Sequence, residues 1–414
     1  MFDCYNLPDC HPPNTTALID RDGDGVGSGD PRIIGVAHPA DLDDANLSKW
    51  KKDPNNPIRI NNGTVASAGP SDLWVERGGT TNMVMQLNRA IGRFESTDPN
   101  LHTWTVADPD FFTSGGNGGH GATGVAFFPL PGSTEGDLLT HMLGGIWGRG
   151  GGKEFPVGCP WVYLGHYDPT VGKFLNSTAA QPLDFGPMVI WSTIDAQADG
   201  RILHVGWFNY GTGALTVPRS ITYDRTLQAL IAQPVAELAT LRGDVLGAVS
   251  ATTTVEPGGA LAVFKKGATA TAFDLEAEIS LPAGKAASFG AAILASAADN
   301  AAVLLNVNVS APGPDGVREV NMSASVPHAT AAGYNATHSF RHPDAPVIAL
   351  RVLADRMMVE IFVGGGRGAV TTPVLAPGKE PLNAGAYILA GVDTELVVAA
   401  ASAWKMGCGW ARYP

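Results

Sequence analysis

A small set of ionisable side chains could act as acids, bases or nucleophiles. His120 follows the glycine-rich turn at residues 115–119 and titrates near neutral pH, which suits proton transfer. Glu135 and Glu154 stand in turn-like segments and could donate a proton, with a solvated loop carboxylate as the alternative. Asp53 opens a turn rich in Pro and Asn and is a candidate carboxylate nucleophile. These residue types suit general acid–base and nucleophilic chemistry.

Metal-ligating residues form no complete pattern. Asp20, Asp22 and Asp24 alternate as in the first half of a calcium-binding EF-hand loop, but Pro31 stands where the twelfth-position Glu is needed. The four cysteines have no spacing typical of a zinc site: Cys4, Cys10, Cys159 and Cys408. Of these, only the first two are close enough in sequence to bridge locally. We therefore expect an acidic turn at residues 20–25, no metal site and no cofactor.

Composition points to β structure and away from nucleic acid and membrane. The 27 basic and 39 acidic residues give a net charge of −12, with no Lys/Arg run that could neutralise phosphates. Charged residues are only 16% of the chain, while Gly reaches 51 and Pro 30, which favours tight turns between short strands. The most apolar stretch, residues 386–406, contains Asp393 and Glu395, which would be costly in hydrocarbon.

The start of the sequence has neither the basic nor the apolar region of a secretory signal. Seven Asn-x-Ser/Thr acceptors nevertheless occur, where composition alone gives roughly two or three. They are Asn14, Asn46, Asn62, Asn176, Asn308, Asn321 and Asn335. This excess predicts a glycoprotein of the secretory pathway, secreted or vacuolar. The alternative is that Asn, Ser and Thr are simply common in turns.

The sequence pattern of the elements that must position these side chains changes along the chain. After an irregular segment at residues 1–32, residues 33–226 contain short, evenly spaced strands separated by turn clusters, several strands bearing a Trp or Tyr. This pattern suits a propeller or barrel. Residues 227–245 are predicted to be a connector with a helical turn or two. Residues 246–414 alternate Ala and Val with polar residues, include a hairpin at 347–363, and predict a β-sandwich.

Three ordered motifs lie at the end of the predicted propeller. Residues 200–207 read G-R-I-L-H-V-G-W, residues 215–219 read L-T-V-P-R, and residues 234–242 read P-V-A-E-L-A-T-L-R. They resemble the segments G-R-x-x-x-x-G-W, L-x-x-P-R and P-V-x-E-L-x-x-L-R of glycoside hydrolase family 32. That family contains invertases, inulinases, levanases and fructosyltransferases.

The resemblance extends over residues 33 to 375. Residues 36–44 look like the family's A-x-P-x-D segment, and residues 163–168 are similar to Y-x-x-G-x-Y-D. Residues 350–367 resemble the hairpin R-V-x-x-D-x-S-x-V-E-x-F-x-x-x-G-R of its accessory sandwich. The resemblance implies a five-bladed propeller followed by a β-sandwich, and a retaining β-fructofuranosidase activity on sucrose or fructans without a cofactor.

A retaining fructosidase needs a carboxylate nucleophile and a carboxylic acid about 5 to 5.5 Å apart. The family's acid lies in W-E-C-P-D-x-F-x-L, and here Thr123 occupies the position of the Glu. A hydroxyl cannot replace a tuned carboxylic acid. The nucleophile motif W-x-N-D-P-N-G has no counterpart before Ile33, and Asp53 already belongs to a stretch similar to the family's L-x-x-W-x-K-x-x-x-N-P-V. We therefore expect impaired hydrolysis.

Two acidic residues can be carried over from the family. Asp72 matches the Asp of the motif R-D-P, which binds sugar hydroxyls and stabilises the transition state; capping a turn is its alternative role. Asp184 matches the D-Y-G motif at residues 184–186. It is predicted either to bind substrate in the propeller funnel or to orient a loop.

The propeller is expected to be incomplete at its N-terminal end. Roughly 210 residues precede the connector, enough for about four blades of about 45 to 50 residues. A truncated chain or incomplete gene model would explain this, but not the change at Thr123. Two functions follow: a fructosyl hydrolase of impaired activity, or a non-catalytic carbohydrate-binding or scaffold homologue. In both, the expected partner is a sucrose- or fructan-type sugar, and the assembly state stays open.

Overall fold

A computed structural model describes most of the chain in two compact units. The first comprises residues 1–150 and 161–180, and the second comprises residues 151–160 and 181–414. The residues described are 2–4, 33–41, 43, 49–56, 58–60, 63–64, 73–75, 79–87, 90–112, 121–134, 137–147, 160–175, 178, 181–186, 189–197, 199–208, 214–298, 300–327, 334–356, 358–374 and 384–407. No helix among these residues is long and apolar enough to cross a membrane.

The first unit contains two antiparallel meanders of the kind that forms propeller blades. One comprises β7 (Leu73–Val75), β8 (Thr81–Leu87), β9 (Ala90–Ser96) and β10 (Thr103–Phe112), with β5 (Arg59–Ile60) and β6 (Gly63–Thr64) added beside β10. The other comprises β11 (Gly121–Pro129), β12 (His141–Trp147), β13 (Pro160–Asp168) and β14 (Lys173–Leu175). Each strand pairs with its neighbour in sequence, so short turns suffice to connect them.

Short strand pairs accompany the meanders near the start of the chain. They are β1 (Phe2–Cys4) with β2 (Ile33–Gly35), and β3 (Ala37–Pro39) with β4 (Trp50–Lys52). Large side chains from several of the first unit's segments, including Met83, Phe94 and Trp104, form a fully buried cluster. Strand β9 alternates buried and partly buried positions, as expected for a strand with one face on the core.

The second unit begins with a third meander. It comprises β16 (Val189–Ala196), β17 (Ile202–Phe208), β19 (Arg219–Asp224) and β20 (Ala229–Pro234), with β18 (Ala214–Leu215) paired to β17. The 3-10 helix η2 (Ala236–Leu241) follows directly. Its residue Leu238 packs with Val235, Leu353 and Phe362 into a buried cluster. The predicted helical turn is therefore present, and the segment expected to be a connector also contains β20.

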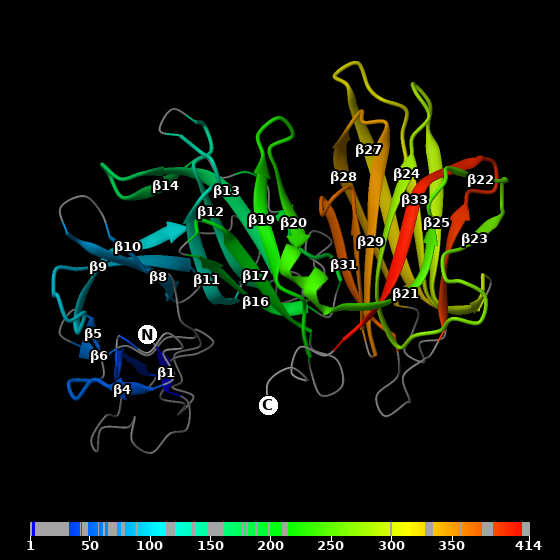
Figure 1. Cartoon of the computed structure of the whole chain (residues 1–414). Helices are drawn as coiled ribbons and strands as arrows, with labels where there is room; N and C mark the ends of the chain where they lie inside the picture. The colour runs from blue at the N-terminus through cyan, green and yellow to red at the C-terminus, as the bar shows by residue number, and fades with distance from the viewer. Residues whose placement is uncertain are drawn as a thin grey trace. The chain divides into compact units, whose positions relative to one another are not determined.

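Two facing sheets form the rest of the second unit (Figure 1). The first sheet has the order β21 (Arg242–Val249), β33 (Leu396–Met406), β24 (Ala272–Ser280), β29 (Val347–Asp355), β30 (Met358–Val363) and β31 (Gly368–Pro373), and β22 (Thr253–Val255) pairs with β33. The second has the order β23 (Ala260–Ala262), β32 (Gly385–Ala390), β25 (Ala287–Ala297), β26 (Asn300–Val309), β27 (Val317–Val326) and β28 (Tyr334–Pro343).

Buried residues on the facing sides of these sheets form the core; they alternate with less buried positions in some strands, whereas β30 and β31 are buried throughout. In β27, for example, Val320, Met322 and Ala324 are buried while Asn321 lies on the exposed face. The predicted hairpin at residues 347–363 is confirmed as β29 and β30, with Asp355 opposite Met358. The predicted domain limits stay predictions.

The glycine-rich turn between β30 and β31 fits closely against β20. Gly366 has a φ of +90°, and a Cβ on it would come within 2.5 Å of the Ala232 carbonyl oxygen. A hydrogen bond also joins the turn to β20: the Ala232 N–H donates to the Gly366 carbonyl oxygen. Only glycine combines this left-handed backbone with so close an approach.

We expect Gly366→Ala to destabilise the second unit by about 2 to 4 kcal/mol, because backbone strain and a collision with rigid backbone add together. Gly267→Ala is the matched control: its φ is +81° but nothing lies within 4 Å of an added Cβ. Urea unfolding of both variants measures the difference. Equal losses of stability would show that the contact with β20 contributes nothing beyond the strain.

Candidate functional site

Strand β7, which begins directly after Asp72, and strand β11, which contains Thr123, meet in the first unit. Trp74, two residues after Asp72, lies in β7, and Phe127, four residues after Thr123, lies in β11. Their ring centroids are 5.0 Å apart, and Tyr167 of β13 packs edge-on against both, at 5.8 and 5.4 Å. Aromatic pairs at these distances prefer such tilted and edge-on arrangements. The structure therefore brings β7 and β11 together.

Thr123 lies within β11, where the sequence predicts the departure from the family pattern. Most of the other candidate residues are outside the residues that the structure describes: Asp72, His120, Glu135, Glu154 and the acidic turn at 20–25. Their predicted roles therefore stay predictions. Among the described residues, no group of three His, Cys, Asp or Glu is arranged to hold a metal ion.

His141, which the sequence does not single out, lies at the start of β12 beside the aromatic cluster. Its ring stacks on Phe127 with centroids 5.1 Å apart, and its Nδ1 lies 2.9 Å from the Thr140 hydroxyl. Burial, with a smaller contribution from nearby His166, lowers the pKa of His141 to about 4. The imidazole is therefore neutral near pH 7, as suits a packed ring. No periodic signal in the sequence marks this position.

Asp53 is held between two histidines close to β4 and β10. Its Oδ2 lies 3.0 Å from the His38 Nε2, and its Oδ1 lies 3.0 Å from the His102 Nε2. The Asn55 N–H donates to Oδ1 at 2.8 Å, and this bond, followed by the histidine contacts, lowers the pKa of Asp53 despite partial desolvation. The carboxylate stays ionised and both oxygens are engaged, which is the geometry of a loop anchor.

Asp184 is completely buried in the second unit. Its Oδ1 accepts hydrogen bonds from the backbone N–H groups of Gly186 and Thr371, at 2.8 and 2.9 Å. Its Oδ2 accepts the Thr371 hydroxyl at 2.5 Å and lies 2.8 Å from the Arg219 Nη2. Substrate binding by Asp184 stays a prediction, and the contacts described here are those of the alternative, a residue that orients a loop.

The two residues after Asp184 also contact the sandwich. The Phe185 N–H donates to the Ala369 carbonyl of β31, and the Phe185 ring stacks on His338 of β28 with centroids 4.9 Å apart. A Cβ on Gly186 would lie 2.1 Å from the Thr371 carbonyl oxygen, so this position requires glycine. Each residue of the Asp-Phe-Gly motif thus has a contact with the sandwich.

Arg219 completes this network between β19 and the sandwich. Its Nη2 donates to the Glu360 Oε2 at 2.6 Å and to the Thr371 hydroxyl at 2.8 Å, and its guanidinium carbon lies 4.9 Å from the Phe362 ring centroid. Arg219, Asp184 and Glu360 are at most 1% exposed. Glu360 also accepts the Val217 N–H at 2.7 Å. A buried charge is tolerated only when paired and hydrogen-bonded in this way.

Two buried carboxylates share this one guanidinium. Burial raises the pKa of Glu360 and the charge of Asp184 adds to the effect, while Arg219 and the Val217 N–H oppose it. His204, opposite Arg219 in β17, is fully buried, and burial together with Arg219 holds its pKa well below the usual range. Neither ring nitrogen of His204 has a hydrogen-bond partner among the described residues. The imidazole is therefore neutral here.

Sequence reasoning did not identify the Arg219–Glu360 pair. Arg219 ends the L-x-x-P-R motif and Glu360 lies in the V-E-x-F motif, so both positions were visible as matches. Their separation of 141 residues hides the contact, and so does the separation of 187 residues between Asp184 and Thr371. In β30 the available signal was one charged residue, Glu360, in an otherwise apolar strand, whereas β19 gave no such contrast because it also contains polar and charged residues.

Comparisons with known proteins agree on one family. Residues 237–404 match the family model described as "Glycosyl hydrolases family 32 C terminal". The chain is 26% identical over 372 residues to a levanase of Bacillus sp. (strain L7), covering 83% of this chain and 38% of that protein. It is 26% identical over 252 residues to the beta-fructofuranosidase insoluble isoenzyme 1 of Daucus carota, covering 53% of this chain and 41% of that protein. The chain thus spans about two fifths of the length of these relatives.

The fold is shared with solved structures of this family. Fructan 1-exohydrolase IIa from Cichorium intybus superposes with a TM-score of 0.72 at 19% identity, covering 92% of this chain and 80% of that one. A variant of the same chicory protein in complex with 1-kestose superposes with a TM-score of 0.68. The predicted fold class, a β-propeller followed by a β-sandwich, is confirmed.

The shared guanidinium predicts a pH dependence. Because the pKa of Glu360 is raised above its ordinary value of 4.5, its stabilising contribution is present at low pH and is lost as the pH rises through the folded-state pKa. We expect the stability of the native protein relative to Glu360→Gln to fall as pH rises, by up to about 1.4 kcal/mol for each unit between the two pKa values. Urea unfolding across a pH series measures this.

The exposed Glu278→Gln change on the same sheet is the control and should leave the pH profile unchanged. A stability difference between native protein and Glu360→Gln that grows with pH would contradict the assignment, because it would mean that Glu360 is an ordinary ionised partner of Arg219.

Proposed function

Because the chain belongs to glycoside hydrolase family 32, we propose that it recognises fructosyl sugars of the sucrose or fructan type and hydrolyses them poorly. The observation that carries this proposal is Thr123, which lies in β11 at the position of the family's acid/base Glu. This position is internal, so it does not depend on where the sequence begins. The aromatic contact between β7 and β11 supports its placement beside the strand that follows Asp72.

The chemistry explains the expected weakness. In a retaining mechanism one carboxylate attacks the anomeric carbon while a carboxylic acid protonates the departing oxygen. A Thr hydroxyl does not lose its proton near neutral pH, so the leaving group would depart without general acid catalysis. Such catalysis contributes about 10² to 10⁴ in rate. His141 is a poor substitute, because its pKa of about 4 leaves it uncharged near neutral pH and its ring is packed against Phe127.

Sugar recognition would survive the loss of the acid. Asp72 would bind sugar hydroxyls and stabilise positive charge on the fructosyl ring, the role implied by the resemblance to the family. Solved relatives support the substrate class, since the chicory variant was solved with 1-kestose. The seven Asn-x-Ser/Thr acceptors support a secretory destination, secreted or vacuolar.

The second candidate is a non-catalytic homologue that binds carbohydrate or serves as a scaffold. The same Thr123 favours it, because a chain without an acid can keep its binding groups while losing turnover. The contacts of Asp184 with Thr371 support this candidate, since they engage the Asp of a family motif with the sandwich. The two candidates differ only in whether any fructose is released.

Calorimetry with sucrose and with 1-kestose, paired with an assay for released fructose, tests the proposal. We expect binding that Asp72→Ala weakens, and a kcat roughly 10² to 10⁴ below the usual 1 to 10³ s⁻¹ of enzymes. Thr123→Ala is the matched control and should leave the residual rate unchanged.

Absence of binding to either sugar would contradict the proposed recognition and favour the scaffold. Rapid fructose release that Asp72→Ala abolishes and Thr123→Ala leaves intact would contradict the proposed impairment. It would mean that another residue supplies the proton.

A further inference from the structure

Three Asn-x-Ser/Thr acceptors lie in neighbouring strands of one sheet. Asn308 is in β26, Asn321 in β27 and Asn335 in β28. In a strand, residues two apart point to the same face, so Asn321 shares a face with Ser323 and Asn335 with Thr337. Ser310, which completes the acceptor of Asn308, directly follows β26. These are the three acceptors whose Asn lies in the residues that the structure describes.

Burial shows which face this is. The middle residues of the three acceptors are buried, with exposures of 2% for Val309, 2% for Met322 and 5% for Ala336. The three Asn residues are exposed. Their carboxamides therefore project from the outer face of the sheet, away from the core between the two layers of the sandwich.

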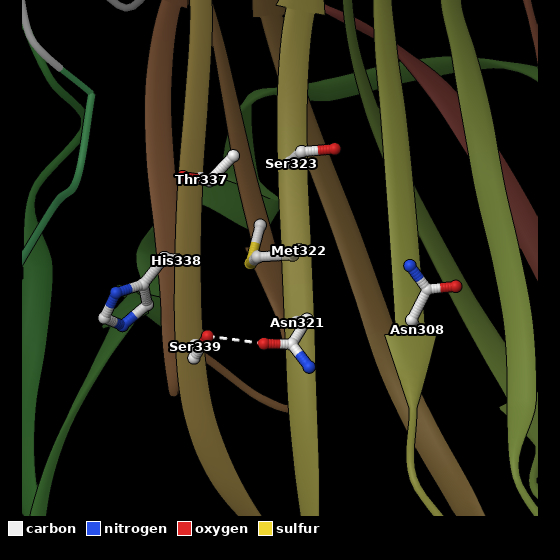
Figure 2. Close-up of a pocket in the computed structure, with 7 residues that line it drawn as sticks. All are labelled: Asn308, Asn321, Met322, Ser323, Thr337, His338 and Ser339. Atoms are coloured by element: carbon white, nitrogen blue, oxygen red, sulfur yellow. Dashed lines mark hydrogen bonds between the residues drawn. The ribbon is translucent and has the colours of Figure 1, made fainter.

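Figure 2 shows two of these Asn residues beside a shallow hollow of about 400 Å³. The side-chain oxygen of each of these two Asn residues accepts a hydrogen bond. The Ser288 hydroxyl donates to the Asn308 Oδ1 at 3.0 Å, and the Ser339 hydroxyl donates to the Asn321 Oδ1 at 2.5 Å. Each bond fixes the carboxamide through its oxygen and not through Nδ2, the atom to which an N-linked glycan is attached. In Figure 2 the nitrogen of each carboxamide is on the side of the other Asn.

The register makes two of the three acceptors neighbours. Asn308 and Asn321 are direct cross-strand partners, so their Cβ atoms are about 4.5 to 5.5 Å apart. We infer that the first sugars of two oligosaccharides would collide at that spacing, so that only one of the two Asn residues is modified in a given molecule. Asn335 is opposite Ser325, four residues along β27 from Asn321, and is therefore about 13 Å distant along the strand.

We propose that the outer face of β26, β27 and β28 is an N-glycosylated surface carrying two glycans, one on Asn335 and one shared between Asn308 and Asn321. In the transfer, Nδ2 attacks C1 of the first sugar of a polyprenyl-diphosphate-linked oligosaccharide. The new N–C1 bond forms, the C1–O bond breaks with its electron pair leaving on the diphosphate, and Nδ2 loses one proton. This proposal is independent of any fructosyl hydrolysis.

The location gives the Asn335 glycan a physical role. Strand β28 pairs with β27 on one side and is the terminal strand of its sheet among the described strands. An exposed terminal strand can pair with another chain and start aggregation, and natural proteins block such edges with bulky or charged groups. A glycan on Asn335 would act as this block.

The test uses the full chain fused to a secretion leader in a yeast host. An endoglycosidase that leaves one sugar on each occupied Asn allows the intact mass to count the glycans. The variants are Ser310→Ala, Ser323→Ala, their combination, and Thr337→Ala, each of which removes an acceptor and keeps its Asn. Ser325→Ala, on the same face of β27 but outside any acceptor, is the control.

Thr337→Ala and the Ser310→Ala/Ser323→Ala combination should each lower the count by one, while Ser310→Ala, Ser323→Ala and Ser325→Ala alone should not. A loss of one glycan in both single variants would overturn the proposal, because it would mean that Asn308 and Asn321 are occupied together. An unchanged count in both the Ser310→Ala/Ser323→Ala combination and Thr337→Ala would equally overturn it, because the face would then carry no glycan.

Discussion

The burial of Arg219 is the constraint on which the arrangement of the second unit depends. Its guanidinium is inaccessible to water, and its Nη2 alone contacts Asp184, Glu360 and Thr371. Removing one partner from such a network leaves an uncompensated buried charge, which typically costs 3 to 5 kcal/mol. The third meander and the sandwich are therefore held in one arrangement by polar contacts, while the apolar cluster around Leu238 and Phe362 supplies the buried area beside them.

This interface changes what the sequence motifs mean. The Asp-Phe-Gly motif, the Arg of L-x-x-P-R and the Glu of V-E-x-F all meet in the same buried network. Family patterns at these positions can arise from the joining of a blade sheet to a sandwich, with no part in sugar chemistry. Resemblance in these segments is therefore strong support for the fold and weak support for activity, since a fold hosts many functions and the site determines which one is present.

Local patterns predicted much of the fold. The alternation within residues 246–414 and the hairpin of β29 and β30 were visible because a strand's period of two residues and a tight turn are local properties. The strands β9, β10 and β12 were not predicted, because their Gly, Arg and Asp residues interrupt the apolar signal. The substitution at Thr123 was visible from motif spacing, whereas the partners of Asp184 were not, because contacts between segments far apart in the sequence leave no local trace.

The distance along the chain between the partners of this network also has a consequence for biosynthesis. The ribosome adds Asp184 to the nascent chain 187 residues before Thr371, and Arg219 141 residues before Glu360. At roughly 5 to 20 residues per second, the ribosome needs about 10 to 40 seconds to supply the missing partners. During that interval the third meander presents ionised groups and an unmatched apolar surface, so it is a natural client for chaperones until translation reaches the last strands of the sandwich.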